Sequence, residues 1–223
     1  MIDSKSGIIG LAVGDAMGVP LEFCTREKLM QNPITEMIGY GTHNVPKGCW
    51  SDDSSMTFAT MDAIIKDKGV NYNTIATNFL EWAKNAKYTS IERVFDIGRT
   101  CLRAISKYES KQDVAEKCGG TSEMDNGNGS LMRILPLAYY CYSKNMKENE
   151  IYEIVKNVSS ITHGHEISIM GCFIYVLYGI ELLDNKNLSQ AYENVKKIKY
   201  TIYFSEETIE RYDRILQNDI NKY

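Results

Sequence analysis

The chain has 223 residues, a formal net charge of −4 and a pI near 5.5. This length fits one large domain over 1–223, and a hydrophobic share of 43% suffices for a sizeable core. The acidic balance argues against a broad basic surface for nucleic acid. It leaves room for a small anionic ligand held by a few arginines or by helix N-termini.

The cysteines and the N-terminus indicate a compartment. Six cysteines occur without a CxxC pair or zinc-site spacing, which predicts reduced thiols. The first 18 residues lack a basic n-region, and Gly14 and Asp15 interrupt their apolar run, so no secretory signal is expected. No apolar run looks long enough to span a bilayer. We therefore predict a soluble, cytoplasmic protein without a membrane partner.

Apolar residues recur with helical spacing along most of the chain, and no alternating strand pattern is convincing. The sequence predicts an all-α, orthogonal multi-helix domain in which Trp82 anchors the core. Pro136 is expected to kink or break its helix. Helices are predicted at 4–17, 26–30, 51–65, 74–84, 91–107, 111–117, 130–142, 149–160, an apolar stretch after 165, 188–199 and 208–216.

A turn followed by a helix start at 48–65, GCWSDDSSMTFATMDAII, is the stretch around which the chain is organised. Ser51 or Asp52 is a natural N-cap, and one carboxylate there stabilises the helix dipole. Asp52 and Asp53 beside a hydroxyl also offer hard oxygen ligands of the kind that Mg²⁺, Mn²⁺ or Ca²⁺ prefers. Capping and metal binding both fit this stretch.

Three further polar residues precede that stretch. Asp15 lies in an apolar, glycine-rich helix, where a carboxylate is costly unless it is paired, hydrogen-bonded or on a cavity wall. Glu22 follows just beyond that helix. A site role and a solvated position fit both carboxylates equally well. His43 lies in a long loop and is predicted to be a surface histidine.

The loop at 118–129 is polar and glycine-rich and continues as DNGNGSLMR. It fits neither an EF-hand, nor a dinucleotide fingerprint, nor a P-loop. A loop that leads into a helix start with Arg133 in the first turn suits a phosphate group, although an ordinary helix-start turn fits as well. His163 and His165 are a poor chelating pair. One imidazole faces a pocket or caps the following helix.

Four segments together resemble the ADP-ribosylglycohydrolase family, in an order and spacing that cover nearly the whole chain. They are GLAVGDAMGVPLEF (10–23), WSDDSSM (50–56), GNGSLMRILPLA (127–138) and ITHGHE (161–166). The resemblance implies an all-α hydrolase with a binuclear Mg²⁺ or Mn²⁺ site. Its substrate would be an ADP-ribose-modified protein or small molecule, cleaved at the glycosidic bond.

The resemblance also implies site residues. Ser51, Asp52 and Asp53 match metal ligands, and Asp53 and Glu22 match the catalytic carboxylates. Asp15 matches a supporting residue. The match to the ADP-ribose loop covers Gly127, Asn128, Gly129, Ser130, Met132 and Arg133, and His163 matches the histidine that lines the cleft. Two metals would orient the ribose hydroxyls and place a water, with proton transfer assisted by Glu22.

One departure from the family pattern is the absence of a second metal motif, Asp-x-Asp-Ser/Thr, anywhere in the 223 residues. We expect a chain that lacks its C-terminal portion and self-associates through the apolar surface this leaves exposed. Three hypotheses follow: a metal-dependent hydrolase, a catalytically impaired ADP-ribose or nucleotide binder, and an inert fragment. The sequence leaves open the acceptor linkage, the choice between Mg²⁺ and Mn²⁺, and the oligomeric state.

Overall fold

The computed structural model describes residues 4–184 and 186–217, and within them it contains helices, turns and one isolated bridge between Gly120 and His163. The predicted all-α class is confirmed. The α-helices are α1 (Ser4–Gly18), α2 (Arg26–Gln31), α3 (Asp52–Asp67), α4 (Tyr72–Asn85), α5 (Arg99–Glu109), α6 (Leu135–Ser143), α7 (Glu148–Ser160), α8 (Glu166–Leu183), α9 (Leu188–Lys196), α10 (Glu206–Glu210) and α11 (Asp213–Leu216).

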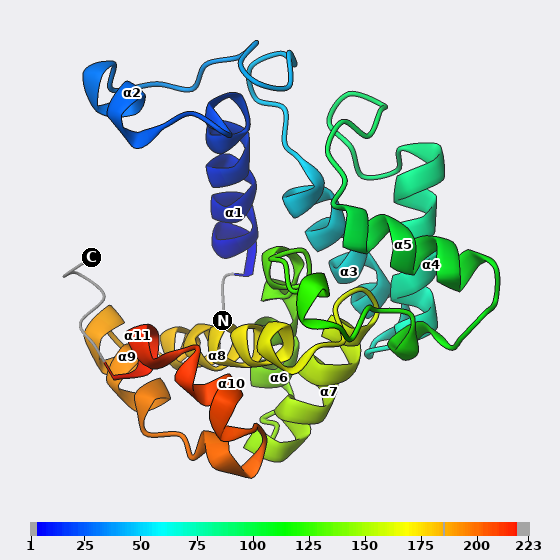
Figure 1. The fold of residues 1–223 in the computed structure, drawn as a ribbon, viewed down its shortest axis with the longest axis vertical. Coiled ribbons are helices and arrows are strands. Elements are labelled where there is room, and N and C mark those ends of the chain that lie inside the picture. Colours follow the sequence, from blue (N-terminus) through cyan, green and yellow to red (C-terminus); the bar gives the residue numbers. More distant parts are fainter. Residues whose placement is uncertain (1–3, 185, 218–223) are drawn as a thin grey trace.

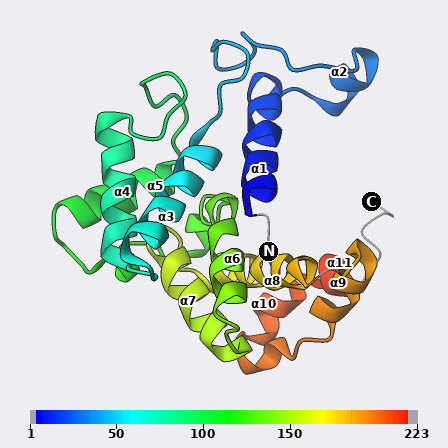
Figure 2. The same cartoon turned by 180° about the vertical axis from the view of Figure 1, so that it is seen from behind.

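Helix α8 is the central element of the core and packs against α6, α7 and α9. In Figures 1 and 2 it runs crosswise to α1, with α3 to α5 on one side and α9 to α11 at the other end. Met170 and Phe173 of α8 are fully buried.

The same helix corrects one expectation about membranes. By length and composition α8 is a candidate membrane span, with a mean hydropathy of 1.6 over its 18 residues. The prediction that no apolar run is long enough is therefore wrong on these two criteria. Half of α8 is buried inside the protein, which is also the environment of a core helix.

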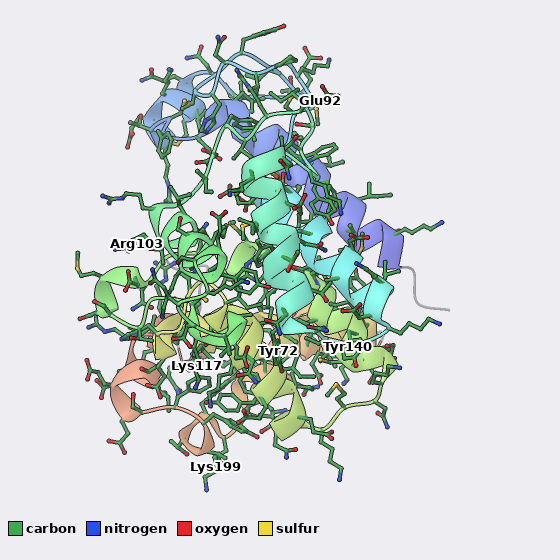
Figure 3. All side chains as sticks on the ribbon, turned by 90° about the vertical axis from the view of Figure 1, so that its right-hand side faces the viewer. Tyr72, Glu92, Arg103, Lys117, Tyr140 and Lys199 are labelled. Carbon is green, nitrogen blue, oxygen red and sulfur yellow. The ribbon has the colours of Figure 1, made fainter. Side chains whose placement is uncertain are left out.

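Helices α3 and α4 pack together and carry much of the remaining core. Trp82 is 1% exposed, which confirms its predicted role as an anchor. The buried amide of Asn78 donates from Nδ2 to the Ala59 carbonyl oxygen at 2.9 Å and so joins the two helices. Asn157 of α7 donates to Tyr72 Oη at 3.2 Å, a contact at the lower end of α4 in Figure 3.

Several predicted helix bounds are wrong, each for a local reason. The helix expected at 91–107 begins only at Arg99, because the extended Gly98 is its N-cap. The helix expected at 130–142 is a 3-10 turn, Leu131–Arg133, followed by α6. Pro136 lies in the first turn of α6, where its missing N–H costs nothing, so it starts this helix and does not kink it.

The expected segment at 111–117 is helical only at the 3-10 turn Ala115–Lys117. The helix expected at 188–199 ends at Lys196, and the one expected at 208–216 divides into α10 and α11.

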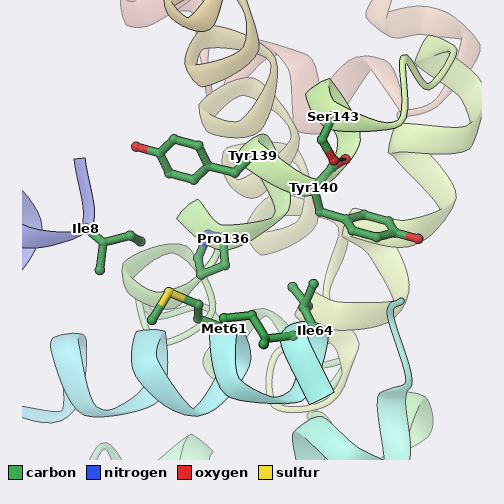
Figure 4. A pocket seen from close by; sticks show the side chains of 8 residues that line it. Ile8, Met61, Ile64, Pro136, Tyr139, Tyr140 and Ser143 are labelled. Atoms are coloured by element: carbon green, nitrogen blue, oxygen red, sulfur yellow. Dashed lines mark hydrogen bonds between the residues drawn. The ribbon is translucent and has the colours of Figure 1, made fainter. Parts of the chain in front are cut away.

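Helix α1 is covered along one face only. Ile8 and Ala16 are buried, whereas Ile9 and Val13 are 59% and 45% exposed. On the covered side, a groove of about 320 Å³ lies between α1, α3 and α6. Figure 4 shows Ile8 of α1 across this groove from Pro136 of α6. The groove is apolar, and none of the predicted site residues lines it.

Candidate active site

The start of α3 is fixed by a carboxylate from α1. Ser51 is the N-cap of α3, and its Oγ accepts from the Asp53 N–H at 3.2 Å. Asp15 accepts from the backbone N–H groups of Ser51 and Ser54, each at 3.0 Å. It also accepts from their hydroxyls, at 2.8 and 2.6 Å. Asp15 is therefore a hydrogen-bonded group that supports the start of α3, which agrees with the supporting role that the family resemblance implies. It fixes the backbone from which the next two aspartates project.

Asp52 and Asp53 lie together in a poorly solvated, negatively charged place. Burial raises the pKa of Asp52 to about 8, with further contributions from Asp96, Asp53 and Asp15. Burial, and then the charge of Asp15, raise the pKa of Asp53 to about 6. Within the described chain neither carboxylate forms an ion pair with a lysine or arginine. Dipole stabilisation alone does not account for one buried and one half-buried carboxylate side by side without a cation.

Three ligand-type side chains converge beside them. Candidate ligand atoms of Glu22, His43 and Asp96 all lie within 4.8 Å of one another. His43 Nε2 and Glu22 Oε2 are 2.6 Å apart, and the His43 side chain is only 13% exposed. The prediction of a surface histidine is therefore wrong: the loop folds back, and His43 packs on Phe95 with ring centroids 5.3 Å apart.

Asp96 is a candidate site residue that the sequence analysis missed, because 91–107 was predicted to be one amphipathic helix. In the structure, residues 91–98 form an irregular segment that brings Asp96 to the acidic cluster. The available signal was an aspartate between Phe95 and Ile97, a short apolar context in which a carboxylate needs a partner.

The glycine loop is the second half of the candidate site. Gly127 and Asn128 are exposed, whereas Gly129 and Ser130 are buried. No hydrogen bond among the described residues uses the backbone N–H groups of 127–130 as donors. A Cβ on Gly129 would lie 2.7 Å from both Cys101 Sγ and His163 Cε1. Glycine is needed there because the loop presses against these two side chains.

Other residues of the same motif support the loop from inside. Ser130 Oγ accepts from Ser159 Oγ at 3.0 Å, and the Met132 carbonyl oxygen accepts from Thr57 Oγ1 at 3.2 Å. Arg133 is fully buried and donates to the Gly129 carbonyl oxygen at 3.2 Å. These contacts face the core, not a ligand.

Arg133 therefore corrects the expectation of a guanidinium that meets a phosphate at a helix start. Its guanidinium carbon lies 4.5 Å from the Phe79 ring centroid, and Nη1 has no hydrogen-bond partner. No carboxylate pairs with it in the described chain, and the ring face compensates part of the buried charge. In this structure Arg133 holds the loop in place.

The two histidines after α7 have separate roles. His165 is the N-cap of α8 and accepts from the Ile167 N–H at 3.3 Å. His163 is 2% exposed, and burial, with a contribution from the charge of Arg133, lowers its pKa to about 4. One imidazole thus caps the helix and the other lies against the glycine loop, as a neutral ring.

Cys101 connects the two halves of the site. Its thiol lies against Gly129 and His163, and its pKa is raised to about 12, first by burial. The charge of Arg133 lowers this pKa, while those of Asp52 and Asp53 raise it, which places the acidic cluster within electrostatic reach of the glycine-loop side.

The donor set fits a hard divalent cation. Carboxylates from Asp52, Asp53, Glu22 and Asp96, with the Ser51 hydroxyl, are the oxygen ligands that Mg²⁺ and Mn²⁺ take. The raised pKa values of Asp52 and Asp53 show that this place disfavours uncompensated negative charge, and a bound cation would relieve that cost.

The fold and this site together define an all-α protein with a cluster of metal-ligand-type carboxylates and a glycine-rich loop whose N–H groups are unused within the described chain. The sequence profile of the ADP-ribosylglycohydrolase family matches residues 4–222. The chain belongs to the ADP-ribosylglycohydrolase family.

Two named relatives are similar to this chain at modest identity. ADP-ribosylarginine hydrolase Tri1 of Pseudomonas putida is 28% identical over 172 residues, which cover 76% of this chain and 43% of that protein. ADP-ribosyl dinitrogen reductase glycohydrolase of Rhodospirillum rubrum is 30% identical over 166 residues, 74% of this chain and 52% of that protein. The match spans about half the length of these relatives.

One solved structure has the same fold. It is described as an ADP-ribosylglycohydrolase-related protein complex, and the TM-score is 0.60 at 22% identity. The superposition covers 96% of this chain and 62% of that one.

Proposed function

We propose that this chain is a divalent-metal-dependent hydrolase that releases ADP-ribose from a modified protein or small-molecule acceptor. The observation that carries the proposal is the pair of adjacent carboxylates, the buried Asp52 and the half-buried Asp53, beside a glycine loop with unused N–H groups. Family membership and the names of the two relatives support the same reaction.

In this proposal some residues bind the substrate and the metal ions, and others transfer protons. The backbone N–H groups at 127–130 would donate hydrogen bonds to the diphosphate oxygens, as backbone donors do at other phosphate sites. Ser51, Asp52 and Asp53 would hold the metal ions. Asp15 would fix the start of the helix that carries them, through its hydrogen bonds to Ser51 and Ser54. When bound, Mg²⁺ or Mn²⁺ would acidify a water and orient the ribose hydroxyls.

Glu22 and Asp53 are the candidates for proton transfer during cleavage at the ribose anomeric carbon. Glu22 lies near enough to Asp53 to raise its pKa, and its Oε2 contacts His43. A carboxylate in that position can take a proton from an attacking water while the acceptor group leaves.

The test is release of free ADP-ribose from an ADP-ribosylated arginine peptide and from an ADP-ribosylated serine peptide, each with Mn²⁺ or Mg²⁺. Asp52→Ala and Asp53→Ala should each reduce turnover at least a hundred-fold, and Glu36→Gln, at an exposed loop position, is the control. Comparison of the two peptides identifies the linkage. Undetectable turnover of the wild type with both metals would overturn the proposed activity.

A non-catalytic ADP-ribose binder is the second candidate. It is favoured by the lack of an Asp-x-Asp-Ser/Thr sequence in these residues, so that only one metal half-site is encoded here. Calorimetry distinguishes the two, because saturable ADP-ribose binding without turnover supports the binder. If the protein neither binds ADP-ribose nor releases it from a substrate, the inert-fragment hypothesis is the one that remains.

Self-association is part of the proposal. The sequence analysis expected it on the C-terminal side of the domain; the exposed apolar face that we assign to it among the described residues is that of α1. Ile9, Val13 and Met17 are 59%, 45% and 39% exposed, and a Cβ added to Gly10 or Gly14 beside them would meet open space. Light scattering after size-exclusion chromatography should detect a dimer that Val13→Asp dissociates. A wild-type monomer at high concentration would contradict this prediction. The predicted cytoplasmic location stays a separate proposal, to be tested by cell fractionation.

A further inference from the structure

Three buried polar side chains form a continuous chain behind the glycine loop. Arg133 Nη2 lies 2.7 Å from Thr162 Oγ1, and Thr162 Oγ1 lies 2.9 Å from His163 Nδ1. Arg133 and Thr162 have no exposed surface, and His163 has 2%. Water does not compete for these bonds, so their direction follows from the donors and acceptors that the side chains possess.

The guanidinium fixes the direction of the first bond. Arginine carries only donors, so Arg133 donates and the Thr162 oxygen accepts. The Thr162 hydroxyl then retains one proton to donate, and the imidazole nitrogen Nδ1 is an acceptor within range. If Nδ1 carried the proton instead, the Thr162 hydroxyl proton would need another acceptor in a fully buried place.

The alternative acceptor is weak. The Cys101 thiol also interacts with the Thr162 hydroxyl, and its raised pKa keeps it a neutral thiol. A neutral thiol sulfur is a poor acceptor compared with an imidazole nitrogen. The Thr162 proton therefore goes to His163 Nδ1, and the single proton of the neutral imidazole resides on Nε2.

His163 Nε2 points to the loop. It lies 3.4 Å from the position of a Cβ on Gly127 and 3.3 Å from that of a Cβ on Gly129. It forms no hydrogen bond with any described residue. Arg133 Nη1 is the one fully buried side-chain polar atom without a partner in the described chain, so Nε2 retains some solvent contact.

We propose that Arg133 and Thr162 are positioning residues that hold His163 as the Nε2-protonated tautomer, with its Nε2–H as a fixed donor to an oxygen of the bound ligand. The ligand side of this statement rests on the proposed function and concerns a phosphate or ribose oxygen on the loop. The tautomer itself does not depend on that function. Asp125 and Arg133 are the charged groups that act on this imidazole.

The first test reads the tautomer directly. Long-range ¹H–¹⁵N spectra of the labelled protein report the protonation of each imidazole nitrogen, and the chain has only three histidines to assign. The expected result is a protonated Nε2 and a hydrogen-bonded, unprotonated Nδ1 for His163. Thr162→Ser should preserve the Nδ1 shift, and Thr162→Val should move it to that of an unbonded nitrogen. A protonated Nδ1 in the wild type would overturn the proposal, whatever the activity.

The second test measures ADP-ribose affinity by calorimetry in a double-mutant cycle. Thr162→Val should weaken binding about five-fold, as expected for one weakened neutral hydrogen bond, and Thr162→Ser should stay within about two-fold. In a His163→Gln background, Thr162→Val should have no further effect. An equal loss in both backgrounds would show a merely structural role and overturn the proposal.

The two tests separate the inferences. A wild type that binds no ADP-ribose would remove the proposed function, while the spectra would still decide the tautomer. A thermal melt identifies any variant that fails to fold. If Thr162→Val fails to fold, the spectra of the wild type and of Thr162→Ser decide which imidazole nitrogen of His163 is protonated.

Discussion

The buried carboxylate at the start of α3 makes the stability of the metal-free protein depend on pH. Asp52 has an ordinary pKa of 3.8 in the unfolded chain and about 8 in the folded protein. Because the folded pKa is raised, folding disfavours the charged form. The free energy of unfolding therefore falls as pH rises from about 4 towards 8, and the full cost is present above the folded pKa.

Replacing Asp52 by Asn removes this cost while keeping the shape of the side chain. Between the two pKa values the cost grows by about 1.4 kcal/mol per pH unit. The stability difference between Asp52→Asn and wild type should therefore increase by roughly 3 kcal/mol from pH 5 to pH 7. For a chain of this size that corresponds to a gain of about 9 °C in the difference between their midpoints.

The assay is a thermal melt in EDTA at both pH values, with Glu36→Gln as the control for loss of an exposed carboxylate. Added Mn²⁺ should raise the wild-type midpoint at pH 7, since it binds only the folded state, and should raise that of Asp52→Asn much less. An equal midpoint difference at pH 5 and pH 7 would refute the reasoning, because it would show that Asp52 is not charged at a cost in the folded protein.

Five further substitutions, of which Gly10→Ala and Ile65→Ala are matched controls at exposed positions, test the packing of the protein. Gly119→Ala should lower the melting midpoint by several degrees, because its Cβ would lie 2.5 Å from the Ser160 carbonyl oxygen and 2.7 Å from the backbone nitrogen of His163. In the control Gly10→Ala the new Cβ meets open space, and this substitution should stabilise α1 by about 0.5–1 kcal/mol. Asp15→Ala should cost about 1–3 kcal/mol in urea denaturation, because Ser51 and Ser54 lose their acceptor; an unchanged midpoint would contradict its supporting role. Trp82→Ala should cost about 3–5 kcal/mol, while Ile65→Ala, at a site 65% exposed, should change stability by less than about 1 kcal/mol.

The features that the sequence predicted well depend on neighbours within one helical turn. Ser51 caps α3 through the N–H two residues on, and the periodic apolar residues of α4 bury Trp82. The bounds of the 91–107 segment failed because an amphipathic period does not reveal where an extended glycine starts the helix.

The sequence by itself determined the all-α class, the family motifs and the position of the carboxylate pair at a helix start. Only the tertiary structure decided that Arg133 is a buried support, that His43 contacts Glu22 and that Asp96 joins the cluster. The physical reason is sequence separation. Arg133 and Thr162 are 29 residues apart, and Asp15 and Ser51 are 36 apart. Burial, pKa and hydrogen-bond direction arise only when such distant segments meet.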